Sequence, residues 1–204
     1  MKYPKFFDDI QPIKLQDPLA DALGAFQNGE YEISYTEVVK GAGHSCPTVA
    51  GAYLMTLYAL KTLYPDSPAL RGDIEVYFKE NLEEGVAGVI GNVISYITGA
   101  TDKSGFKGLG GKFARHSLMH FGSDIDNASA RFCSKSSGKC VDLFYDPSSI
   151  QADPQMQPLM QRIMQGTASK EEKERFGTLW QKRVADIFAN SAKVISLREL
   201  KKDS

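Results

Sequence analysis

The residues of this chain best suited to chemistry are a histidine and a cysteine separated by one serine. His44, Ser45 and Cys46 follow the small-residue run Gly41-Ala42-Gly43 and precede Pro47. Pro47 suits the first turn of a helix, which makes Cys46 the N-cap and places its sulfur beside unpaired backbone N–H groups. This setting favours the thiolate, the form of cysteine that binds metals and attacks electrophiles.

A metal ion is the first chemistry that this pair indicates. In an extended loop, His44 and Cys46 lie on the same side of the chain, so an imidazole nitrogen and a sulfur can bind one ion. Zinc accepts both ligand types, and another divalent transition metal is the alternative. Two ligands are too few, and the candidates to complete the site are the other histidines, His116 and His120, or water. The competing interpretation is a loop histidine, a buried cysteine and two half-exposed strand histidines.

Four polar residues are expected near such a site, either as substrate contacts or as hydrogen-bonding neighbours of the ligands. They are Tyr35, Asn92, Lys107 and Arg115. Lys107 lies in the glycine-rich turn 105–112, whose glycine spacing and lack of a following Ser or Thr do not fit a phosphate-binding loop. The turn is therefore interpreted as structural.

Composition excludes several classes of function. The 204 residues carry a net charge of −1, which provides no basic surface for nucleic acid. The uncharged stretches 41–60 and 85–101 are too short or too polar to cross a membrane. Three cysteines do not make a disulfide framework, and the chain begins without a basic-then-apolar leader, so a cytoplasmic protein is expected. Cys133 and Cys140 are then interpreted as buried thiols, with a local disulfide as the alternative.

The elements that position these residues predict an α+β fold, in which a mixed or antiparallel sheet packs against two buried helices and further helices follow. Helices are expected over residues 19–26, 47–63, 84–98 and 169–190, and around Met156, Met160 and Met164. Strands are expected over 73–79, 112–121, 129–135 and 140–145, the last two as a hairpin. Residues 33–39 fit either element. We expect one domain over 1–204, with a core of about 17–145 and a helical C-terminal extension of about 148–204.

The element Gly43-His44-Ser45-Cys46-Pro47, followed by Gly51 and an apolar helix, resembles the formylmethanofuran dehydrogenase FmdE family. The resemblance continues through Ile97–Thr101, Gly105 and Gly111-Lys112 and covers about residues 17–145. It implies an α+β fold, a homodimer, and a metal, usually zinc, at His44 and Cys46.

This chain departs from the FmdE pattern in two places. Val89 and Asn92 stand where many members have a cysteine and an aspartate, and the helical segment 154–190 replaces the zinc ribbon of some members. The predicted function is a metal-binding FmdE-like protein, acting as a metal-assisted or redox-accessory enzyme with a small-molecule ligand. The alternatives are a non-catalytic accessory or interaction protein, and a metal-free thiol enzyme that uses Cys46 with His44 as its base.

Overall fold

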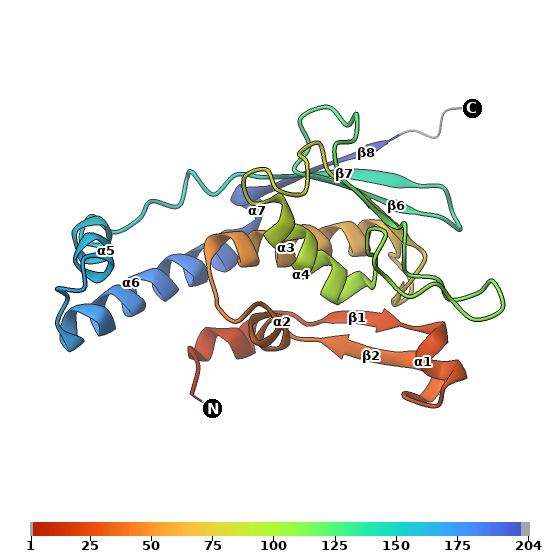
Figure 1. The fold of residues 1–204 in the computed structure, drawn as a ribbon, viewed down its shortest axis with the longest axis horizontal. Helices are drawn as coiled ribbons and strands as arrows, with labels where there is room; N and C mark the ends of the chain where they lie inside the picture. The colour runs from red at the N-terminus through yellow and green to blue at the C-terminus, as the bar shows by residue number, and fades with distance from the viewer. Residues whose placement is uncertain (1, 201–204) are drawn as a thin grey trace.

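The computed structural model describes residues 2–200 as three layers, with helices between two β-sheets (Figure 1). The helices are α1 (Pro18–Ala22), α2 (Tyr35–Ala42), α3 (Pro47–Leu63), α4 (Ala87–Thr98), α5 (Met156–Met164), α6 (Lys170–Ala189) and α7 (Ser191–Val194), with short 3-10 turns at Lys5–Asp9 and Gln27–Gly29. The strands are β1 (Ile13–Gln16), β2 (Glu30–Ile33), β3 (Ala69–Leu70), β4 (Ile74–Tyr77), β5 (Met119–His120), β6 (Ala130–Ser134), β7 (Cys140–Tyr145) and β8 (Ile195–Leu200). This architecture confirms the predicted α+β class.

The two sheets lie on opposite sides of α3 and α4 (Figure 1). One has three strands in the order β2-β1-β3, and the other has five in the order β5-β4-β6-β7-β8. The pairs β4–β6, β6–β7 and β7–β8 are antiparallel, whereas β4–β5 and β1–β3 are parallel. The sequence predicted one mixed sheet, so the three-stranded sheet and β8 are additions.

Helix α3 occupies the middle layer, and its bounds match the predicted 47–63. It is buried along most of its length because both sheets and α4 pack around it. Tyr53 ties it to the three-stranded sheet by donating hydrogen bonds to the carbonyls of Gln11 and Ile33, at 2.8 and 3.2 Å. On the other side, a Cβ built at Gly51 would lie 2.3 Å from the ring of Tyr145, so only glycine fits there.

The ambiguous segment 33–39 contains the end of a strand and the start of a helix. Strand β2 ends at Ile33, and α2 begins at Tyr35. Ser34 between them forms a capping box with Glu37, in which each side chain binds the other residue's backbone N–H. The same arrangement at Ser169 and Glu172 starts α6, as the sequence predicted.

The predicted strand 112–121 is wrong except for its last residues, since only Met119–His120 is a strand. The preceding residues form a loop that folds back on residues 101–106: the N–H of Thr101 donates to the carbonyl of Arg115, and the N–H of Arg115 donates to the carbonyl of Phe106. Phe113 and Ser117 adopt φ of 63° and 55°, which a strand does not permit.

Cys133 and Cys140 form a disulfide, so the interpretation as buried thiols is wrong and the local pair is correct. The register of the β6–β7 hairpin places the two residues directly opposite one another. Cys46 is thus the free cysteine of the described chain. Within residues 2–200, no helix is both long and apolar enough to cross a membrane.

Candidate functional site

The loop that carries His44 and Cys46 joins α2 to α3. Gly43 ends α2 in the left-handed conformation, with φ of 77°, which glycine adopts without strain. Three residues later Cys46 caps α3, and Pro47 is the first residue of that helix. The loop is therefore as short as two helix ends permit, and its path is fixed at both ends.

His44 is exposed at this loop and holds one ring nitrogen against the backbone. Its Nδ1 lies 3.0 Å from the carbonyl oxygen of Ala42. A carbonyl oxygen only accepts, so Nδ1 carries the hydrogen and the neutral ring presents Nε2 as a free acceptor. Metal-binding histidines commonly have this second hydrogen bond, which fixes the tautomer and the ring orientation.

Cys46 confirms the predicted N-cap geometry. Its Sγ accepts a hydrogen bond from the N–H of Val49 at 3.4 Å, and the residue is 9% exposed. The sulfur thus lies at the N-terminus of α3, beside the unpaired backbone N–H groups of the first turn, and solvent reaches it only at its edge.

Ser45, between the two candidate ligands, is held by hydrogen bonds with side chains from other parts of the chain. Its carbonyl accepts hydrogen bonds from Trp180 Nε1 at 2.9 Å and from Gln181 Nε2 at 3.1 Å, both from α6. Its hydroxyl lies 2.9 Å from the hydroxyl of Tyr35. Nothing in the sequence indicated that the indole N–H of Trp180 reaches this loop.

Tyr35 was expected to contact a substrate or the ligands, and the structure buries it completely. Burial raises the pKa of its hydroxyl well above the usual value, so the group stays neutral. It does not line the hollow beside His44 and contacts the site only through Ser45. Tyr35 is therefore a residue that positions the loop.

A hollow of about 270 Å³ opens beside His44, between α2 and α4. The residues that line it are Val38, Gly41, Ala42, His44, Val89, Asn92, Val93 and Tyr96. Val89 and Asn92, which form one of the two expected departures from the FmdE pattern, thus line the same hollow as His44. Its walls are mainly apolar, and the polar groups that it offers are the imidazole, the amide of Asn92 and the phenol of Tyr96. Cys46 is not among its lining residues.

His116 and His120 are not brought to this loop. His120 lies beside Tyr77 in register and stacks on its ring at 4.6 Å. Ile74 and Val76, which alternate with Tyr77 along β4, are buried in the core, so His120 projects from the other face of the sheet. His116 lies in the preceding loop with Nδ1 3.1 Å from the hydroxyl of Ser117. The described residues contain no group of three or more His, Cys, Asp or Glu side chains placed to hold a metal ion.

Lys107 and Arg115 also lie apart from the hollow. Lys107 is exposed in the loop after α4. Arg115 is buried, and its guanidinium binds the carboxylate of Asp17 at 2.5 Å. Asp17 in turn caps α1 by accepting from the N–H of Leu19. Arg115 thus holds the 101–118 loop to the N-terminal part of the fold, and a buried ion pair replaces the predicted substrate contact.

These features define the class of protein: an α+β fold with a His-x-Cys loop at the N-terminus of its central helix. A family model described as FmdE, molybdenum formylmethanofuran dehydrogenase operon, matches residues 42–196, which are 155 of the 204 residues. The chain belongs to this family. The match starts just before His44 and extends through α5 and α6, beyond the expected end near residue 145. No curated protein matches the chain.

Proposed function

We propose that this FmdE-family chain is a metal-binding accessory protein. In this proposal His44 and Cys46 are the protein's ligands to a divalent transition metal, with zinc as the first choice. A small molecule in the hollow between α2 and α4 takes a position that the protein leaves open. The observation that carries the proposal is the hydrogen bond from His44 Nδ1 to Ala42, because it leaves Nε2 free on a residue that lines the hollow.

The donor chemistry fits an open metal site better than a closed one. The imidazole of His44 is in the tautomer that leaves Nε2 free to bind a metal. The N-terminus of α3 favours the thiolate of Cys46. A closed structural zinc site needs four protein ligands, and the described residues do not provide them. When bound, such an ion acts as a Lewis acid toward a carbonyl or lowers the pKa of bound water to about 7.

The residues of the hollow would orient the small molecule. Asn92 offers both a donor and an acceptor without charge, whereas Val89 and Val93 offer apolar contact. A neutral carbonyl compound with an apolar part matches this lining better than a highly charged one. Ser45 and Tyr35 would act indirectly, by keeping His44 and Cys46 at fixed positions.

Metal content measured by elemental analysis tests the proposal. The protein is purified without added metal, titrated with one equivalent of zinc and desalted, as the wild type and as His44→Ala, Cys46→Ser and His116→Ala. Serine retains the N-cap function, so Cys46→Ser removes the thiolate and spares the helix start. We expect His44→Ala and Cys46→Ser to lose the metal, and His116→Ala to retain it. Equal zinc in all four proteins would contradict the proposal.

A metal-free thiol enzyme is the second candidate, and the sulfur at the N-terminus of α3 is the observation that favours it. The rate of Cys46 alkylation against pH in chelator-treated protein separates the two. Alkylation that persists well below pH 8, and that falls with His44→Ala, would favour the thiol enzyme. A homodimer stays a prediction from the family, and the solution mass of the purified chain tests it.

A further inference from the structure

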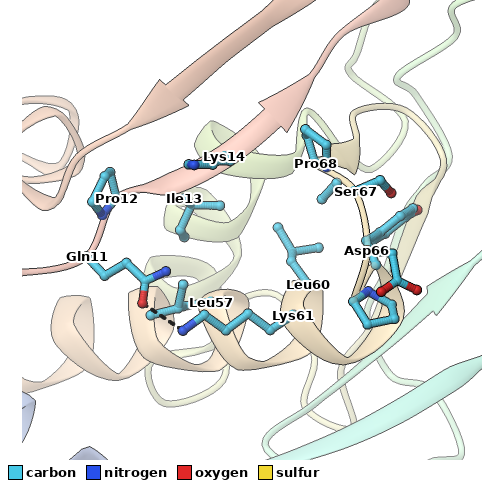
Figure 2. A pocket seen from close by; sticks show the side chains of 13 residues that line it. Gln11, Pro12, Ile13, Lys14, Leu57, Leu60, Lys61, Asp66, Ser67 and Pro68 are labelled. Atoms are coloured by element: carbon cyan, nitrogen blue, oxygen red, sulfur yellow. Dashed lines mark hydrogen bonds between the residues drawn. The ribbon is translucent and has the colours of Figure 1, made fainter.

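A second hollow lies between β1, the last turns of α3 and the segment Tyr64–Pro68 that leads to β3 (Figure 2). Its volume is about 370 Å³, which is in the range of small-molecule sites. It shares no lining residue with the hollow beside His44. The two hollows are therefore separate places on the molecule.

One end of this hollow presents two hydrogen-bond donors. The Nζ of Lys61 donates to Oε1 of Gln11 at 2.7 Å. An ammonium only donates, so the atom that faces Lys61 is the amide oxygen, and the amide NH₂ of Gln11 stays available. Figure 2 shows the pair at one end, with the amide nitrogen turned toward the interior. Lys61 uses one of its three hydrogens on Gln11 and has two to offer.

The backbone of β1 adds a third donor. The N–H of Arg71 donates to the carbonyl of Gln16, so Gln16 and, two residues earlier, Lys14 turn their backbone groups toward the β3 side. The register pairs β3 with Leu15 and Gln16 and stops there. The N–H of Lys14 therefore extends past the paired part of the strand, at the hollow that Lys14 lines.

The middle of the hollow is apolar, and its far end is acidic. Ile13, Leu57 and Leu60 form the apolar wall, and each of them is buried. The carboxylate of Asp66 lies at the end opposite Gln11 and Lys61 (Figure 2). A bound molecule thus meets donors and positive charge at one end, hydrocarbon in the middle and negative charge at the other end.

We propose that this hollow binds a short-chain monocarboxylate. The carboxylate accepts from Lys61 Nζ, Gln11 Nε2 and the N–H of Lys14, and the hydrocarbon part lies against Ile13, Leu57 and Leu60. The position of Asp66 excludes a second carboxylate at the far end, because two negative charges would then meet without a cation between them. The site accordingly distinguishes a monocarboxylate from a dicarboxylate of the same length.

The ligand preference is tested by methyl NMR with two probes of matched length: hexanoate and adipate. We expect hexanoate to shift the methyl signals of Ile13, Leu57 and Leu60, with a dissociation constant on the order of 1 mM. Adipate is expected to bind at least about 10-fold more weakly, because its second carboxylate lies against the carboxylate of Asp66. Absence of shifts at tens of millimolar hexanoate, or adipate binding as tightly as hexanoate, would overturn the proposal.

Substitutions of Lys61 and Asp66 test the roles of the two ends. Lys61→Met retains the aliphatic stem and is expected to weaken hexanoate binding about 10-fold or more, whereas Lys61→Arg retains most of it. Asp66→Asn is expected to improve adipate binding, and Lys173→Met on α6 is the matched control without effect. An unchanged methyl spectrum of the free variants shows that they are folded, with Lys61→Gln as the replacement for a variant that is not. Wild-type hexanoate affinity in a folded, neutral Lys61 variant would refute the assignment.

Discussion

The close contact between Gly51 of α3 and Tyr145 of β7 makes a sharp stability prediction for Gly51→Ala. A Cβ at this position would lie 2.3 to 2.5 Å from ring atoms of Tyr145, far inside normal contact distance. The ring is not free to move away, because its hydroxyl donates to the carbonyl of Pro47 at 2.7 Å. Accommodation of the methyl group therefore requires a shift of α3 or loss of that hydrogen bond.

The magnitude follows from three contributions. Overpacking a dense core costs about 1 to 3 kcal/mol. Loss of the Tyr145 hydrogen bond adds about 1 kcal/mol. Replacement of glycine by alanine inside a helix raises the stability by about 1 kcal/mol through helix propensity. We expect Gly51→Ala to lower the free energy of unfolding by about 1 to 3 kcal/mol.

Urea unfolding followed by circular dichroism measures this change, and Gly177→Ala is the matched control. Gly177 also lies inside a helix, but a Cβ there would meet nothing within 4 Å, so its substitution should stabilise the protein by about 0.5 to 1 kcal/mol. The double variant Gly51→Ala/Tyr145→Ala should lose less stability than the two single changes together, because the contact that causes the strain is gone. Equal stabilisation by both glycine substitutions would refute the reasoning.

Three further predictions concern charge, covalent bonding and the site loop. Burial raises the pKa of Asp142, but hydrogen bonds from its two arginine partners outweigh this and the net pKa lies below the usual value. Stability from this carboxylate should thus be complete at neutral pH and lost as pH falls below about 4, and urea midpoints of Asp142→Asn should vary less with pH in that range. Serine at both Cys133 and Cys140 opens a short loop and should cost about 2 to 3 kcal/mol in urea unfolding without changing zinc content; unchanged stability would mean that the bond is absent. Trp180→Phe removes one donor to the Ser45 carbonyl, so it should lower the stability in thermal unfolding by about 1 to 2 kcal/mol and weaken zinc binding. An unchanged zinc affinity would mean that this hydrogen bond does not position the metal ligands.

Local signals were sufficient to predict α3 and α6, whereas the expected helix 19–26 ends at Ala22 and α7 was not predicted. Pro47 after Cys46 marked the start of α3, and the pair Ser169 and Glu172 marked the start of α6, because caps depend on neighbours in the sequence. The β6–β7 hairpin was predicted for the same reason, since its turn residues lie between its strands. The residues that start or end each of these elements lie within or next to it in the sequence.

The elements that the sequence missed depend on distant partners. Residues 112–118 were predicted as a strand, yet the buried pair of Arg115 with Asp17 and the hydrogen bond from the N–H of Thr101 to the carbonyl of Arg115 hold them in a loop. Strand β8 pairs with β7 along its whole length, although most of its residues are exposed.

The same distinction between local signals and distant contacts applies to the candidate site. The cap at Cys46 was predicted because Pro47 follows it, and His44 sits at the hollow that Asn92 also lines. His120 could not be placed by spacing, since a sheet face is decided by pairing with β4. The metal at His44 and Cys46 stays a prediction.

The two hydrogen bonds from α6 to the carbonyl of Ser45 mean that the C-terminal helices are not an optional attachment. A fragment that stopped after β7 would lack both donors, and the loop between α2 and α3 would lose its hydrogen bonds to α6. A shortened version of this protein should therefore keep the chain through α6. Substitutions in that helix should be checked for their effect on the position of His44.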